Sequence, residues 1–154
     1  MNQNFVAVVV VGMSLLLLAS PAVAQERVAE NYDTKNTITL KGTVFGVIIA
    51  PRMPVCIFVN TKDAAGKTEK WVVEGATVKE LRLAGWKFFS PSGTLKLGDQ
   101  ITISAWLPKP GSKVAETLAA GSPDIAEQLK TGRLAYGTEV KLPDGKKLAF
   151  GTTQ

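Results

Sequence analysis

The stretch from Thr37 to Ile49 constrains the fold more strongly than the rest of the sequence. Up to Val44 it alternates between apolar and polar residues, which is typical of a β-strand with one solvated face. Beyond that point it has no polar face, and Gly42 and Gly46 lie where a strand would bend or bulge. A strand that is half solvated and then buried on both sides is typical of a small closed barrel, in which one strand pairs in two parts of the sheet.

The N-terminal 24 residues have the pattern of a secretory signal peptide. Residues 5–19 are apolar apart from one glycine and one serine, and Ala22-Val23-Ala24 forms a small-x-small site just before Gln25. The apolar run is shorter than the ~20 residues that a membrane span needs. We therefore expect residues 1–24 to be cleaved between Ala24 and Gln25, with no membrane span afterwards. The sequence thus predicts a periplasmic or secreted protein.

The remaining residues predict one domain preceded by a short leader. Residues 25–36 are polar and are expected to form a flexible N-terminal leader. Residues 37–154 are expected to form a single barrel domain. The chain has one cysteine, Cys56, so no internal disulfide can stabilise the fold. The apolar run around Cys56 favours a buried thiol over a reactive one.

The rest of the chain alternates between strand patterns and turn signals. We expect further strands over residues 55–61, 68–74, 100–107, 134–142 and 147–150. Thr77 and Glu80 form a capping-box pattern, which predicts a short helix over residues 78–84. Residues 113–132 have a different character and are interpreted as an insertion with a helix over residues 123–130.

This order of elements predicts a mainly β protein. Three strands, a short helix and two further strands follow one another in the oligonucleotide/oligosaccharide-binding (OB) fold. We therefore expect a five- to six-stranded OB-fold-like barrel, with one short helix between strands 3 and 4 and a helical insertion after strand 4. A closed barrel hides its strand edges, which suits an exported protein without a disulfide.

Four short segments carry a family resemblance. They are Tyr32-Asp33 before residues 38–44, residues 71–75, Gly85-Trp86 before residues 97–99, and residues 142–148. With these segments the chain resembles the DUF6152 family of exported bacterial proteins of unknown function, which implies an exported small barrel. Members of that family carry a histidine-rich start and an Asn-Pro-His turn after the first strand, whereas this chain has no histidine. A metal or ligand role of those histidines therefore does not carry over.

The residue types argue against catalysis and metal binding. The chain lacks histidine, which is the commonest general base and the commonest metal ligand in proteins. Its carboxylates are dispersed, and lysines lie beside several of them, so no segment has the ligand spacing of a metal site or the paired acids of a glycosidase. We therefore expect no catalytic residue, no metal site and no cofactor.

An outward-facing aromatic residue near several cations is the best candidate for a binding site. Trp106 lies on the outward side of a predicted strand, Arg52 in the turn after the first strand, and Lys109 and Lys113 after the fourth. An aromatic ring with cationic neighbours suits stacking on a sugar or base that carries an anionic group. The alternative is that Trp106 packs beneath the inserted helix and that the lysines are merely solvated.

The net charge of +5 favours anionic partners. Export disfavours nucleic acid and leaves phospholipid head groups, acidic glycans and other envelope components. The sequence therefore predicts a non-catalytic binding module for an anionic small molecule, glycan or envelope component. The alternative is a structural or interaction protein, or an accessory subunit, that binds a protein partner through residues 113–132.

Overall fold

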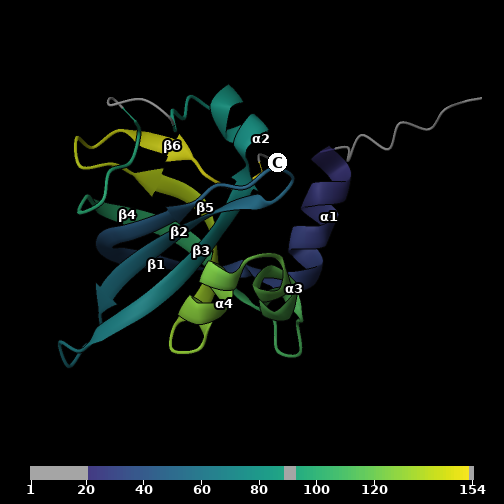
Figure 1. Ribbon diagram of the computed structural model, residues 1–154, viewed down its shortest axis with the longest axis horizontal. Coiled ribbons are helices and arrows are strands. Elements are labelled where there is room, and N and C mark those ends of the chain that lie inside the picture. The colour runs from purple at the N-terminus through teal and green to yellow at the C-terminus, as the bar shows by residue number, and fades with distance from the viewer. Residues whose placement is uncertain (1–20, 89–92, 153–154) are drawn as a thin grey trace, which may run out of the picture.

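The structure is a computed structural model that describes residues 21–88 and 93–152 (Figure 1). The elements in those ranges are α1 (Pro21–Asn31), β1 (Tyr32–Ile48), β2 (Pro54–Lys62), β3 (Thr68–Thr77), α2 (Val78–Leu83), β4 (Gln100–Pro108), α3 (Val114–Gly121), α4 (Pro123–Leu129), β5 (Arg133–Lys141) and β6 (Lys147–Ala149). Residues 1–20 of the predicted signal peptide lie outside the described ranges. None of the helices in these ranges is long and apolar enough to cross a membrane.

The strands close into a barrel, as the pattern of the first strand predicts. The sheet order is β3-β2-β1-β4-β5-β6, and a parallel pairing of β3 with β5 closes five of these strands into a ring. β1 pairs twice, because residues 42–48 pair with β2 and residues 37–43 with β4. α2 lies between β3 and β4, and α3 and α4 follow β4. The predicted OB-fold-like barrel is therefore confirmed.

Two glycines allow β1 and β2 to approach each other closely. A Cβ on Gly42 would lie 2.2 Å from the backbone oxygen of Asn60, and a Cβ on Gly46 would lie 2.6 Å from the Phe58 ring. The register of β1 against β2 also shifts between Val44 and Gly46, which is the bulge expected there. At Gly42 a side chain would meet the backbone of β2, and at Gly46 it would displace the Phe58 ring.

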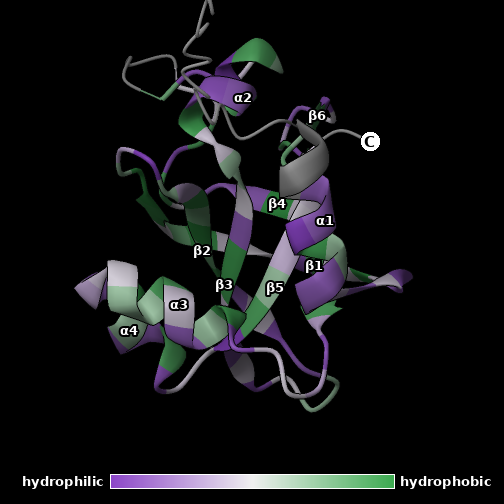
Figure 2. Ribbon diagram, turned by 90° about the vertical axis from the view of Figure 1, so that its right-hand side faces the viewer, coloured by the Kyte–Doolittle hydropathy of each residue, from purple (hydrophilic) through white to green (hydrophobic). Residues whose placement is uncertain are grey.

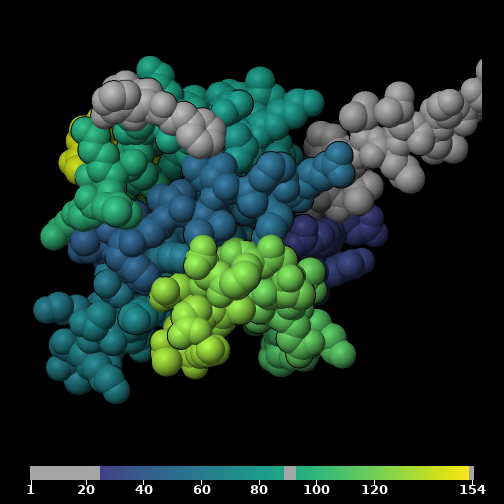
Figure 3. All heavy atoms as spheres, viewed as in Figure 1, coloured from purple at the N-terminus to yellow at the C-terminus, as the bar shows by residue number. Residues whose placement is uncertain are grey.

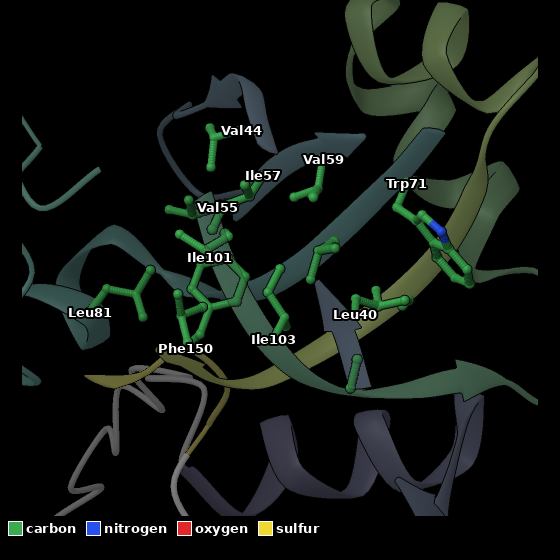
Figure 4. Close-up of a cluster of buried hydrophobic side chains, with 14 of the residues drawn as sticks. Leu40, Val44, Val55, Ile57, Val59, Trp71, Leu81, Ile101, Ile103 and Phe150 are labelled. Atoms are coloured by element: carbon green, nitrogen blue, oxygen red, sulfur yellow. The ribbon is translucent and has the colours of Figure 1, made fainter. Parts of the chain in front are cut away.

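The barrel interior is filled by one apolar cluster, which we call the inner core. Figure 4 labels ten of its members: Leu40, Val44, Val55, Ile57, Val59, Trp71, Leu81, Ile101, Ile103 and Phe150. Phe150 is fully buried, and Cβ atoms on Gly75 or Gly137 would come within 2.7 Å of its ring. The Trp86 ring packs on Phe150 with centroids 5.3 Å apart, and its indole donates to the Ala149 carbonyl at 2.7 Å. The ring of Phe150 therefore takes the space that these two glycines leave.

The capping box predicted at Thr77 and Glu80 is present. Thr77 Oγ1 accepts from the Glu80 N–H at 3.4 Å, and the Glu80 carboxylate accepts from the Thr77 N–H at 3.0 Å. The helix ends at Leu83 instead of the predicted Ala84, and Gly85 follows with a left-handed φ of 101°. These local contacts set the direction in which α2 leaves β3.

A second apolar cluster, which we call the outer cluster, lies on the outside of the barrel. Its buried members are Tyr32, Cys56, Phe58, Val72, Val114, Leu118, Ile125, Leu134 and Tyr136. In Figure 2, α3 and α4 lie to one side of β3 and β5, and α1 lies to the other. Cys56 is fully buried here, which confirms the buried thiol that its apolar neighbours predict.

The insertion after β4 contains two helices, whereas the sequence pattern predicts only the second. Val114 and Leu118 are four residues apart and both buried, so α3 has a single pair of apolar residues on its inner side. One such pair is too short a pattern to predict a helix. Ser122 separates the two helices and caps the second, because its Oγ accepts from the Ile125 N–H at 3.3 Å.

Residues 25–36, expected to form a flexible leader, are instead part of α1 and β1. Val28 packs against the outer cluster, and Tyr32 is buried in it. The sequence pattern does not indicate this helix, because the two apolar residues are four apart among polar neighbours, and the flexibility of the leader stays a prediction. The predicted cleavage bond between Ala24 and Gln25 lies within α1, and its cleavage stays a prediction.

Candidate functional site

A pocket lies between the β1–β2 turn and α2. Figure 1 shows that this turn and this helix are at the same end of the barrel. Its volume is about 680 Å³, within the usual range for sites that bind small molecules. Its lining residues are Ile49, Ala50, Pro51, Arg52, Met53, Thr77, Val78, Lys79, Arg82 and Leu83. In the space-filling view the blue atoms of the turn and the teal atoms of α2 lie on neighbouring parts of the surface (Figure 3).

The turn presents Arg52 in an unusual backbone conformation. Pro51, just before it, has no N–H to donate to a strand ladder, and the Met53 N–H donates to the Ala50 carbonyl at 3.3 Å. Arg52 has a φ of 61°, the only positive φ at a residue other than glycine within the described ranges. This conformation costs such a residue about 1–2 kcal/mol. Glycine would fit the backbone better, so any benefit of arginine here lies in its side chain.

α2 supplies two more cations and an exposed leucine. Lys79 and Arg82 are three residues apart and lie on one side of the helix. Glu80, between them, is engaged in the capping box. Leu83, the last residue of the helix, is 83% exposed. The lining of the pocket thus contains three cations and no carboxylate.

Of the four residues predicted to bind a ligand, Arg52 lines this pocket and Trp106 does not. Trp106 lies on β4 and packs, partly buried, against the outer cluster. Its ring stacks on Tyr136 with centroids 5.9 Å apart, and its indole donates to Thr37 Oγ1 at 3.3 Å. Trp106 therefore packs against β1 and β5, and the alternative interpretation, in which it packs beneath the inserted helix, stays a prediction.

Lys109 and Lys113 also lie away from the pocket, near the ends of α1 and α3. Lys109 Nζ donates to the Ala29 carbonyl at 2.6 Å, close to the C-terminal end of α1, where the carbonyls carry partial negative charge. Lys113 is the residue that precedes α3. The four predicted residues therefore do not form one site. Sequence reasoning misses Lys79 and Arg82, although their spacing on a predicted helix is a readable signal.

A buried carboxylate connects α1 to the barrel. Glu74 on β3 is only 2% exposed. It accepts a hydrogen bond from the Tyr32 hydroxyl and forms an ion pair with Arg27 at 3.0 Å. Burial raises the pKa of Glu74, while the Tyr32 hydrogen bond and the Arg27 charge oppose that rise. These three residues join the N-terminal helix to the outer face of β3.

Cys56 lies opposite Glu74 in the pairing of β2 with β3. Burial, with the charge of Glu74 as the smaller cause, raises the pKa of the Cys56 thiol. A nucleophilic cysteine needs the opposite shift. Across the described residues, no three His, Cys, Asp or Glu side chains gather closely enough to hold a metal ion.

The fold and the pocket together define a class of protein. A closed five-stranded barrel, with a helix between its third and fourth strands and a pocket beside that helix, is a small β-barrel of OB-fold-like topology.

A family of unknown function, DUF6152, has a model that matches residues 13–117, more than half of the chain, and the chain belongs to this family. No curated protein matches the chain. The match ends inside α3, so β5 and β6, which complete the sheet, lie beyond it.

Proposed function

We propose that this protein is an exported, non-catalytic module that binds an anionic small molecule, glycan or envelope component. The pocket between the β1–β2 turn and α2 holds the ligand. One observation carries the proposal: Arg52, Lys79 and Arg82 line a largely apolar pocket that has no carboxylate in its lining. The signal-peptide pattern of residues 1–24 supports export to the periplasm or beyond the cell.

The backbone of Arg52 supports the same role. A residue other than glycine keeps a positive φ mainly where its side chain has a function that outweighs the strain. Arg52 is exposed, so packing does not account for its presence. A guanidinium held in a tight turn can bind a carboxylate or phosphate through two parallel hydrogen bonds.

The alternative function, in which residues 113–132 bind a protein partner, has less support. The apolar side chains of this insertion point inward, and Val114, Leu118 and Ile125 are buried in the outer cluster. α3 and α4 therefore act first as a cover for the barrel, and their apolar faces are already used.

Titration of an anionic apolar dye tests the proposal. The protein without residues 1–24 should bind 1-anilinonaphthalene-8-sulfonate at one site, and Arg52→Gly should weaken that binding by about tenfold. Loss of one hydrogen bond to a charged group costs about 1.5–3 kcal/mol, and each 1.4 kcal/mol is a factor of ten. The substitution also relieves the positive φ, so the thermal midpoint should not fall.

Two controls separate a specific charge contact from general dye adsorption. Lys147→Ala removes an exposed cation on β6, outside the pocket, and should leave the dye affinity unchanged. N-phenyl-1-naphthylamine, an uncharged dye of similar shape, should bind the wild type and Arg52→Gly equally well. Equal affinity of the wild type and Arg52→Gly for the anionic dye would show the proposal to be wrong.

A further inference from the structure

We propose that the ligand of this pocket is a single-headed acidic amphiphile, a hydrocarbon chain that carries one carboxylate or phosphate group. This inference rests on the proposed function of the same pocket and narrows its ligand class. The acidic head contacts Arg52, Lys79 and Arg82 at the rim. The chain lies along the apolar lining and points toward the end of the barrel interior.

The pocket has more apolar surface than a sugar or a small polar anion would use. The apolar residues of its lining are Ile49, Ala50, Pro51, Met53, Val78 and Leu83. Leu83 is 83% exposed in spite of its size. A single exposed leucine is ordinary on a protein surface. At the mouth of a pocket with a cationic rim, however, Leu83 is placed to cover a hydrocarbon chain and to lose its contact with water when the chain binds.

A second, smaller cavity continues the apolar surface beyond Ile49. It has a volume of about 60 Å³, and Ile49 belongs to the lining of both cavities. Val55 and Ile57 of its lining are members of the inner core, and Trp86 forms another part of its wall. The lining also includes Lys87, and Ile49 is the one residue that the two cavities share, so in this proposal the chain passes Ile49 to reach the smaller cavity. A space of about two water volumes fits the end of a chain and excludes a second head group.

The shape of the site favours one amphiphile molecule over a membrane surface. Helices that lie on membranes present a broad apolar face. α2 has six residues, and Leu81 on this helix is buried in the inner core. The other apolar residues of α2, Val78 and Leu83, line a concave pocket, so they can enclose a single chain.

Calorimetric titration with a chain-length series tests the inference. Affinity for monomeric alkyl carboxylates, from hexanoate to tetradecanoate, should rise by about threefold to fourfold for each methylene that is buried. It should level off once the pocket and the smaller cavity are filled. Primary alcohols of the same length should bind about tenfold more weakly to the wild type. Arg52→Gly should reduce this difference between acids and alcohols, since Lys79 and Arg82 remain at the rim.

Two exposed leucines provide a matched pair of variants. Leu83 and Leu97 are 83% and 72% exposed, so serine at either position should leave the thermal midpoint unchanged. Only Leu83 lines the pocket. Leu83→Ser should therefore lower the affinity for dodecanoate by about fivefold to tenfold, while Leu97→Ser should leave it unchanged.

The outcomes distinguish this inference from the proposed function. If the anionic dye binds through Arg52 while carboxylate affinity does not depend on chain length, the pocket binds anions and the amphiphile inference is wrong. If neither the dye nor any carboxylate binds, both proposals are wrong. Binding to phosphatidylglycerol vesicles without binding to monomeric carboxylates would identify a membrane surface as the ligand and would overturn the inference as well.

Discussion

Replacing Phe150 by alanine should lower the free energy of unfolding by about 3–5 kcal/mol, because the ring fills the place where the barrel closes. Phe150 is fully buried, and its ring occupies the space beside Gly75 on β3 and Gly137 on β5. These glycines come directly after Glu74 and Tyr136, the last pair in the parallel pairing that closes the sheet. Without the ring a cavity remains, since neither glycine has a side chain that could move into it.

Urea unfolding followed by tryptophan fluorescence measures this cost. Phe45→Ala is the matched control, since it makes the same chemical change at a half-buried residue that packs on Phe58 with ring centroids 5.7 Å apart. Its cost should be about 1–2 kcal/mol, because a half-buried ring loses less contact and solvent fills the space. A Phe150→Ala cost no larger than that of Phe45→Ala would contradict a role of Phe150 in barrel closure.

The barrel fold can be predicted from the sequence because the patterns that indicate it lie within short segments. In the stretch from Thr37 to Ile49, alternation followed by an apolar run reports burial on one face and then on two. The capping box at Thr77 depends on contacts within four residues. The contact of Phe150 with two glycines is not readable, since it depends on how β3 and β5 align after the chain has closed.

The pocket can be predicted only in part, because some of its residues come together only in the folded chain. Arg52 is identifiable because prolines mark its turn, whereas Lys79 and Arg82 reach the pocket only through the placement of α2 beside that turn. Trp106 does face outward, as its place in the strand pattern predicts. Helices cover part of the outer face of this barrel, however, so an outward direction does not mean exposure to solvent.

Tyr32→Phe should lower the free energy of unfolding by about 2–3 kcal/mol at a pH above the raised pKa of Glu74, because it removes a hydrogen bond to a buried carboxylate. Glu74 accepts from the Tyr32 hydroxyl, and its other oxygen pairs with Arg27, which is half exposed. Tyr136→Phe is the control. Its hydroxyl is also part-buried, but it bonds to the neutral Thr152, so the cost should be about 1 kcal/mol.

A double-mutant cycle shows whether the cost of Tyr32→Phe comes from Glu74. In a Glu74→Gln background the acceptor is neutral, so Tyr32→Phe should cost about 1 kcal/mol. The difference between the two backgrounds measures the coupling between the hydroxyl and the charge. Equal costs in both backgrounds would mean that Tyr32 stabilises the fold through packing of its ring alone.

The pH dependence of stability gives an independent check on the same carboxylate. Burial raises the pKa of Glu74 above its ordinary value of 4.5, so the folded protein favours the neutral form. The contribution of Glu74 to stability is therefore complete below pH 4.5 and is lost as the pH rises through the raised pKa. Glu74→Gln should accordingly gain stability relative to the wild type as the pH rises from 4.5 to the raised pKa, by at most about 1.4 kcal/mol per pH unit.

Tyr32→Phe should extend this dependence to higher pH, since the Tyr32 hydrogen bond lowers the pKa of Glu74 and its loss raises that pKa further. The lowered pKa values of the exposed Asp33 and Glu127 place their own titration below this window. Chemical denaturation at half-unit pH steps would resolve the three curves. Parallel curves for the wild type and Glu74→Gln would show that the carboxyl titrates alike in the folded and unfolded chains, and that burial under α1 does not govern its charge.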